Sequence, residues 1–222
     1  MEKMLYRSEL DAQFAGATED LVATPGWQLG LPTLRGTHVV LRELRTSDAA
    51  SLYAMLNADE VARFISPPPT TIDGYERFIQ WTHRQRRAGE YACFAVTLRG
   101  SDDAIGIFQV RQTDPEFRTA EWGFAIGSPY WGTGVFQDGS RLMLDFVFET
   151  LGVYRLEARA AVTNGRGNGA LRKLGAVKEA VLRRSFVRNG LPVDQALYAI
   201  LQDEWRATMQ LPLVAALPRY VH

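Results

Sequence analysis

The sequence predicts an α+β fold, in which helices cover a mostly antiparallel sheet. Three strand-like runs follow one another with only short, turn-rich loops between them: residues 91–98, 105–111 and 119–126. Apolar residues at helical spacing mark residues 72–87 and 136–150 as amphipathic helices. The pair Asn189-Gly190 separates two further strand-like runs and is a strong signal for a β-hairpin.

Composition and charge limit the class of protein. The chain has 222 residues, 46% of them hydrophobic and 23% charged, as in ordinary globular proteins. It has 25 basic and 25 acidic residues, so no overall field draws it to nucleic acid or to an anionic membrane. Its N-terminus lacks the apolar core of a signal peptide, and no apolar run approaches the length of about 18 residues that a membrane span needs. We therefore expect a cytoplasmic protein without nucleic-acid or membrane partners.

The metal-binding and redox residues are few. Cys93 is the one cysteine, which excludes an internal disulfide, and its strand-like surroundings favour buried packing over a nucleophilic role. The histidines His38, His83 and His222 are scattered and show no zinc-type spacing. The sequence therefore predicts no metal site.

The chain divides into an arm over residues 1–30, one folded domain over residues 31–208 and an apolar tail over residues 209–222. The arm mixes charged, glycine and small residues and contains the breaker Pro25-Gly26. Its apolar anchors, among them Trp27, predict that it packs on its own domain or on a second subunit. The protein is expected to be a monomer or a homodimer.

The folded domain is expected to begin with a strand over residues 38–44. Ser47-Asp48 can then cap a helix that presents Leu52 and Leu56 on one face. Arginines at the C-terminal end of the helix over residues 72–87 fit the negative end of its dipole better than an anion site. Later elements are residues 154–160 (strand), a short helix ending at residues 173–175, residues 177–188 and 193–200 (hairpin strands) and residues 202–208 (helix).

The joint between residues 119–126 and the following helix carries the clearest chemical signal. Gly132-Thr133-Gly134 opens directly into the helix, so backbone can approach a ligand and the free N–H groups of the first helical turn favour an anion. No Lys-Ser/Thr pair follows the glycines, and no third glycine stands at dinucleotide spacing. The joint predicts a phosphate or pyrophosphate site of another kind, and a plain turn is the alternative.

Five motifs in this order resemble the GCN5-related N-acetyltransferase (GNAT) family, and most closely its ribosomal-protein-alanine acetyltransferase branch. They are Leu41-Arg42-Glu43-Leu44, Ala120-Glu121-Trp122-Gly123-Phe124, Tyr130-Trp131-Gly132-Thr133-Gly134, Asn164 through Lys173-Leu174-Gly175, and Asp203-Glu204-Trp205. The resemblance implies a three-layer α/β/α fold around about seven strands, splayed between the fourth and the fifth. It also implies transfer of an acetyl group from acetyl coenzyme A to a primary amine by direct attack in a ternary complex.

The resemblance assigns cofactor contacts to several segments. The pantetheine arm is expected beside Phe124, Ala125 and Ile126, with Asn164 as a hydrogen-bond partner and Lys173 at the same site. Backbone N–H groups of one short segment would bind the pyrophosphate: Trp131, Gly132, Thr133, Gly134, Val135 and Phe136.

The chain departs from the family pattern at three places. Thr133 stands where the family often has a basic residue, Gln137-Asp138-Gly139 replaces Ser/Thr-Glu-Ala, and Gly167 replaces a small hydroxyl residue or alanine. Loss of one positive charge near exposed phosphates should cost about 1 kcal/mol in a high dielectric, so we expect cofactor binding to survive.

The resemblance also suggests the catalytic groups. Glu121 is our candidate general base, acting through water, and a strand glutamate held in a salt bridge is the alternative. Leu171 occupies the position of the tyrosine that many relatives use as the acid. This leaves Tyr130, Tyr198 or solvent to protonate the thiolate, or a thiolate that leaves unassisted, and Tyr130 is our candidate.

The energetics of deprotonation favour one acceptor class. Deprotonating an α-amine at pH 7 costs about 1 to 1.4 kcal/mol, whereas deprotonating a lysine side chain costs about 4.6 kcal/mol. We therefore expect the N-terminal α-amine of a protein or peptide as acceptor. An amine on an antibiotic, polyamine or metabolite is an alternative, and so is a degenerate coenzyme A-binding or interaction module.

Overall fold

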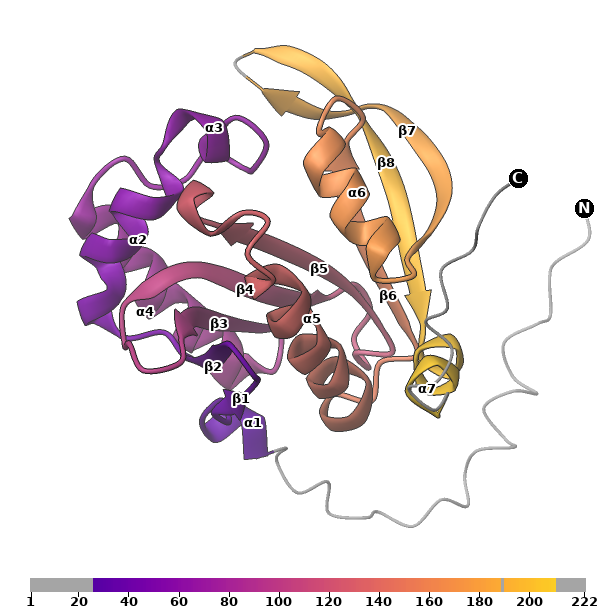
Figure 1. The fold of residues 1–222 in the computed structure, drawn as a ribbon, viewed down its shortest axis with the longest axis horizontal. Helices are drawn as coiled ribbons and strands as arrows, with labels where there is room; N and C mark the ends of the chain where they lie inside the picture. The colour runs from indigo at the N-terminus through magenta and orange to yellow at the C-terminus, as the bar shows by residue number, and fades with distance from the viewer. Residues whose placement is uncertain (1–25, 189, 211–222) are drawn as a thin grey trace, which may run out of the picture.

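A computed structural model describes residues 26–188 and 190–210, and these form an eight-stranded mixed sheet with helices on both faces (Figure 1). The strand order is β1-β2-β3-β4-β5-β6-β8-β7, and every neighbouring pair is antiparallel except the parallel pair β5 and β6. The strands are β1 (Leu34–Arg35), β2 (Val39–Glu43), β3 (Tyr91–Leu98), β4 (Ala104–Gln112), β5 (Thr119–Ile126), β6 (Arg155–Ala161), β7 (Val177–Arg188) and β8 (Leu191–Leu201).

These strands confirm the predicted α+β class. The sheet has eight strands rather than about seven because the two residues of β1 pair with β2, and a run of two is too short to show a period of two. The predicted hairpin is present as β7 and β8, with Gly190 at φ 74° and Asn189 outside the described residues.

Helices and helical turns connect the strands. They are α1 (Gly26–Leu29), η1 (Thr46–Asp48), α2 (Ala49–Leu56), α3 (Asp59–Ala62), α4 (Ile72–Ala88), η2 (Ser128–Tyr130), α5 (Val135–Asp145), η3 (Phe146–Thr150), α6 (Gly165–Lys173) and α7 (Gln202–Gln210). The helix expected over residues 136–150 is α-helical only as far as Asp145, and its last five residues form the π-helical turn η3. No helix among the described residues is both long and apolar enough to cross a membrane.

Two hydrophobic cores, one on each face of the sheet, hold the layers together. Phe94, Phe108 and Met143 belong to the core under α5, α6 and α7. Tyr75 and Ile79 of α4 belong to the core on the opposite face, which α2 and α4 cover. Each fully buried side chain of this size contributes about 1.5 to 3 kcal/mol.

Cys93 is packed in the second core, as predicted. The thiol is fully buried, which raises the pKa of Cys93 to about 12. A thiol so placed is inert as a nucleophile near neutral pH, because the thiolate is the reactive form.

The described part of the N-terminal arm packs on its own domain. Trp27 is buried, and its ring meets Phe117 edge to face at a centroid distance of 5.9 Å. Arg86 of α4 donates to the backbone oxygens of Trp27 and Gln28 and forms an ion pair with Glu43. Arg86 thus ties the arm to α4 and β2, rather than only facing the dipole of α4 as predicted. Residues 1–25 and the tail over residues 211–222 lie outside the described residues.

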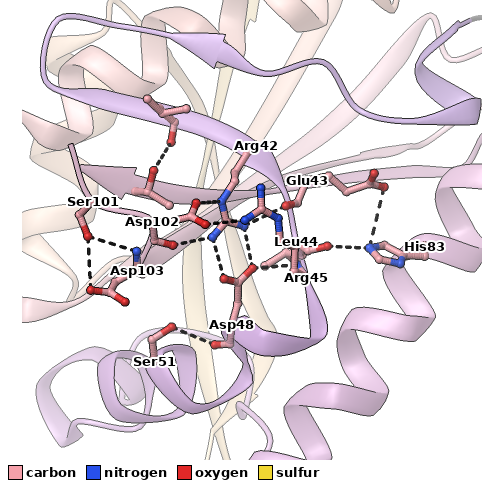
Figure 2. A network of polar contacts seen from close by, with 12 residues as sticks. Arg42, Glu43, Leu44, Arg45, Asp48, Ser51, His83, Ser101, Asp102 and Asp103 are labelled. Carbon is pink, nitrogen blue, oxygen red and sulfur yellow. Dashed lines mark hydrogen bonds and ion pairs between the residues drawn. The ribbon is translucent and has the colours of Figure 1, made fainter. Parts of the chain in front are cut away.

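Asp48 precedes α2 as predicted, but its carboxylate makes no capping bond to that helix. It instead accepts from Arg42 Nη1 at 2.8 Å and Nη2 at 2.7 Å, while both side chains are almost completely buried (Figure 2). Arg42 Nε also donates to Asp102 Oδ1 at 2.7 Å. The network joins β2, η1 and the loop between β3 and β4.

The parallel strands β5 and β6 separate partway along their length. Pairing begins at Thr119 and Arg155 and ends at Trp122 and Ala158. Beyond that point β5 stays paired with β4 on its other side as far as Ile126, and β6 stays with β8. The splay that the family resemblance implied is therefore confirmed, and residues 123–126 have no partner strand on the side of β6.

A candidate cofactor cleft at the splayed strands

A cavity of about 730 Å³ opens where β5 ends. It lies between the turn after β5, the helix α6 and the segment around α3, and Figure 1 shows α3 and α6 at the same end of the molecule, on either side of the end of β5. Volumes of about 300 to 1,000 Å³ are usual for small-molecule sites. The lining residues from the predicted site are Phe124, Ala125, Ile126, Tyr130, Trp131, Gly132, Gly134, Phe136, Asn164 and Lys173.

The two glycines of the turn have a backbone conformation that other residues rarely adopt. Gly132 has φ 78° and Gly134 has φ 88°, both in the left-handed region. A Cβ added to either would meet no atom within 4 Å, so the requirement for glycine comes from the backbone angle rather than from crowding. The turn is braced by Thr133 Oγ1, which donates to the Tyr130 carbonyl at 2.7 Å.

The turn delivers an uncapped helix N-terminus to the cavity. Gly134 is the N-cap of α5 and offers no side chain to the free N–H groups of the first turn. Asp138, the one acidic residue in that turn, has its carboxylate directed elsewhere, since it accepts backbone N–H bonds from His38 at 2.7 Å and Val39 at 3.0 Å. The N-terminus of α5 is therefore available to an anion.

Packing of α5 explains two residues of the departure at Gln137-Asp138-Gly139. Burial alone would raise the pKa of Asp138, but the N–H donors of residues 37–39 outweigh it and hold this pKa below its usual value. Gly139 lets α5 approach the sheet, because a Cβ there would lie 2.8 Å from the ring of Phe108. Asp138 and Gly139 thus fix the position of α5 and do not disable its N-terminus.

Asn164 is held at the cavity by the helix that it starts. It is the N-cap of α6, and its Oδ1 accepts from Gly167 N at 2.9 Å. A Cβ on Gly167 would lie 2.6 Å from Asn164 Nδ2, which accounts for the glycine at this position. Lys173, in the last turn of α6, lines the other part of the same wall.

Three predicted site residues lie outside the cavity lining: Glu121, Thr133 and Val135. Val135 is buried in the core as the first residue of α5, and the Thr133 side chain is engaged within its own turn. Glu121 Oε2 accepts from Arg111 Nη2 at 2.7 Å and lies 3.6 Å from Arg159 Nη1. Its side chain is 20% exposed. Glu121 thus forms the kind of salt bridge that was the alternative to a catalytic role.

The positions of the two candidate general acids, Tyr130 and Tyr198, distinguish between them. Tyr198 is almost fully buried, and its hydroxyl donates to Asn168 Oδ1 at 2.9 Å. Asn168 in turn donates to the carbonyls of Ala161 and Asn164, so this tyrosine serves the packing of α6. Tyr130 is the tyrosine that lines the cavity.

Several lining residues were not identified from the sequence. Glu60 and Arg63, in and after α3, and Arg166 and Gln137, in the first turns of α6 and α5, line the cavity. No glycine pattern or apolar spacing in the sequence identifies these four residues as site residues, because the packing of distant segments brings them to the cavity. Arg166 alone could have been suspected, since it lies two residues after Asn164.

The comparisons agree with this geometry. The acetyltransferase (GNAT) domain family matches residues 38–177. The chain is 25% identical over 176 residues to the uncharacterized N-acetyltransferase p20 of Bacillus licheniformis, covering 79% of this chain and 99% of that protein.

Two solved structures share the fold. One is Mycobacterium smegmatis RimJ in complex with CoA-disulfide, with a TM-score of 0.70, 22% identity and coverage of 78% of this chain and 87% of that one. The other is the ribosomal-protein-S5-alanine acetyltransferase of Vibrio fischeri, with a TM-score of 0.69, 22% identity and coverage of 78% and 98%. Because the family match spans more than half of its length, the chain belongs to the GNAT family of N-acetyltransferases, which use acetyl coenzyme A.

Proposed function

We propose that this chain transfers an acetyl group from acetyl coenzyme A to the free α-amine of a peptide or protein. One observation carries the proposal: the splayed end of β5, the glycine turn with the N-terminus of α5, and Asn164 of α6 all border one cavity. An extended thioester that carries phosphates requires three things together. These are unpaired strand backbone, a helix N-terminus that binds an anion, and a polar side chain on the opposite wall.

The residues present fit this cosubstrate. Residues 123–126 of β5 leave backbone groups free of a partner strand, and these would hold the amide-rich pantetheine arm as an added strand. The backbone N–H groups after Gly134 would hold the pyrophosphate, and Lys173 adds a positive charge to the same cavity. The cosubstrate supplies an activated acetyl thioester.

Backbone and side-chain groups of β5 and the turn would carry the chemistry. An N–H group of the splayed segment would polarise the thioester carbonyl, and one such donor is typically worth about 10² to 10³ in rate. Tyr130, which lines the cavity, would protonate the leaving thiolate. No metal ion is needed for these steps.

Glu121 would take the proton of the acceptor through a water molecule. Because side chains alternate along a strand, Glu121 shares a face of the sheet with Gly123, whose Cα lies about 6.6 Å further along β5. A water molecule would bridge the carboxylate to the acceptor amine. The ion pairs with Arg111 and Arg159 fix the carboxylate at the entrance to the splay.

The acceptor class follows from the energetics. A single carboxylate is a modest base, and it suits an amine that costs about 1 to 1.4 kcal/mol to deprotonate at pH 7 better than one that costs about 4.6 kcal/mol. A free α-amine meets this condition and an ordinary lysine side chain does not.

A thiol-release assay with acetyl coenzyme A tests the assignment. We expect turnover with a peptide that has a free α-amine, and at least tenfold lower kcat/KM with the same peptide blocked at its N-terminus and carrying one lysine. Faster turnover of a polyamine or an aminoglycoside than of the free peptide would assign the small-molecule alternative. Cofactor binding without turnover of any amine would indicate a degenerate binding module.

A further inference from the structure

We propose that Arg166 binds the phosphates of coenzyme A from α6 and replaces the basic residue that the glycine turn lacks at Thr133. This inference rests on the proposed function, since it names a residue that would recognise the cosubstrate. It concerns a side chain on the wall opposite the turn, to which the family resemblance assigns no role.

Arg166 faces the turn across the cavity. Its guanidinium carbon lies 4.6 Å from the ring centroid of Trp131, and both residues line the cavity. The ring is itself fixed, because Trp131 Nε1 donates to the Ile126 carbonyl at 2.8 Å. The indole is therefore a platform that holds the guanidinium beside the anion-binding turn.

Arg166 has no carboxylate partner among the described residues, for which no Asp or Glu oxygen lies within 4.0 Å of it. By contrast, Arg155 and Arg206 each hold a carboxylate with two nitrogen atoms. The acidic residue of the cavity lining, Glu60, is instead bonded to Ser128 Oγ at 2.6 Å. The guanidinium of Arg166 thus keeps its hydrogen-bond donors for a ligand.

The position of Arg166 is unfavourable for the stability of α6. It lies in the first turn of α6, where the helix dipole disfavours a positive charge, and this turn contains no acidic residue to compensate. Helix stability therefore gives no reason for an arginine here. An anion in the cavity gives one, because the N-termini of α5 and α6 and the guanidinium would all act on it.

Arginine also suits phosphate chemically. Its planar guanidinium can donate two parallel hydrogen bonds to phosphate oxygens, which a single ammonium cannot do. From its place against the Trp131 ring, the guanidinium would close over the phosphates bound at the turn. The positive charge missing at Thr133 is then supplied from the opposite wall.

Isothermal titration with coenzyme A, 3′-dephospho-coenzyme A and pantetheine tests this inference on the wild type and on Arg166→Gln, Arg166→Lys and Arg172→Gln. Arg172 is the matched control, because it is an exposed arginine of α6 that does not line the cavity. We expect Arg166→Gln to raise the Kd of coenzyme A about tenfold and to weaken its salt dependence, with pantetheine unaffected. Arg166→Lys should recover part of the loss, and Arg172→Gln should stay within twofold of the wild type.

The outcomes separate the two proposals. An unchanged Kd for coenzyme A in Arg166→Gln, or an equal loss for coenzyme A and pantetheine, overturns the role of Arg166 while leaving the proposed function in place. Similar losses for 3′-dephospho-coenzyme A and coenzyme A place the contact on the pyrophosphate, and a loss confined to coenzyme A places it on the 3′-phosphate. A wild type that binds none of the three ligands overturns the proposed function itself.

Discussion

The carboxylate of Asp138 occupies the space that Gly36 leaves by having no side chain: a Cβ built on Gly36 would lie 2.5 Å from Asp138 Oδ2. The same carboxylate accepts the N–H groups of Thr37, His38 and Val39. A single side chain in the first turn of α5 therefore fixes that helix against the start of β2. Since the glycine turn leads directly into α5, this contact also positions the proposed pyrophosphate site.

Replacing Asp138 with asparagine should destabilise the fold in a pH-dependent way. Loss of the charged acceptor should lower the free energy of unfolding at pH 7 by about 1 to 2 kcal/mol, as for hydrogen bonds to a half-exposed charge. The folded-state pKa of Asp138 is depressed below the unfolded value near 3.9, so its stabilisation is complete above about pH 4 and is lost as the pH falls through the folded pKa. Urea titrations at pH 7 and below pH 4 measure this.

Asp103→Asn is the control for that series, because Asp103 is exposed and bonds only within its own loop. It should change stability little at either pH. Gly36→Ala should act on the same contact. The double variant Gly36→Ala/Asp138→Asn should therefore lose less stability than the sum of the losses of the two single variants. Additive costs would mean that the contact does not fix α5.

The buried pair of Arg42 and Asp48 should be the most sensitive polar contact in the fold (Figure 2). The hydrogen bonds that Arg42 donates to the Asp48 carboxylate raise the pKa of Arg42, whose side chain is only 7% exposed. Asp48→Ala would leave this charge without its buried partner and should cost about 3 to 5 kcal/mol, measured by urea denaturation. Asp102→Asn, which removes the exposed partner of Arg42, should cost much less. Equal losses of stability in the two variants would show that the buried Arg42–Asp48 pair is not the most sensitive polar contact.

Gly134→Ala should weaken cofactor binding through the backbone alone. An L-residue in the left-handed region costs about 1 to 2 kcal/mol, and the turn would relax by moving the N–H groups that face the cavity. Gly100→Ala is the matched control, since Gly100 has φ 92°, equally open surroundings and a place outside the cavity lining. Both variants should lose similar stability in a thermal melt, but only Gly134→Ala should raise the Kd of coenzyme A.

Glu121→Gln should lower kcat by about 10² to 10⁴ without weakening cofactor binding, if Glu121 is the general base. Glu157→Gln provides the comparison, because Glu157 lies opposite Glu121 on β6 and faces Arg159 as well. Loss of turnover in both variants would point to the charge cluster as a structural unit. Unchanged turnover in Glu121→Gln would remove this residue from the mechanism.

Much of the cavity could be predicted because its determinants are local in the sequence. The glycines of the turn and the strand before it each act within a few residues, so their types and spacing describe the backbone directly. Asn164 and the splay between β5 and β6 were not visible in this way, and both were expected from the family resemblance alone.

The remainder depends on contacts between distant residues. Asp138 reads as an acidic residue favourable to the dipole of its own helix, but it bonds to residues about one hundred positions earlier. Asp48 reads as a helix cap until the buried Arg42 is placed beside it. Arg166 reads as part of a polar loop, and only the folded chain shows that it faces Trp131 across a cavity.

The most direct test of the account is a calorimetric titration of the wild-type protein with acetyl coenzyme A, with coenzyme A, pantetheine and ATP as comparisons. We expect binding of both forms of coenzyme A at micromolar Kd, weaker binding of pantetheine and no binding of ATP. ATP shares the adenine and phosphates, but it has no pantetheine arm to lie along residues 123–126. Binding of ATP as tight as that of acetyl coenzyme A, or no binding of either form of coenzyme A, would contradict the proposed cleft.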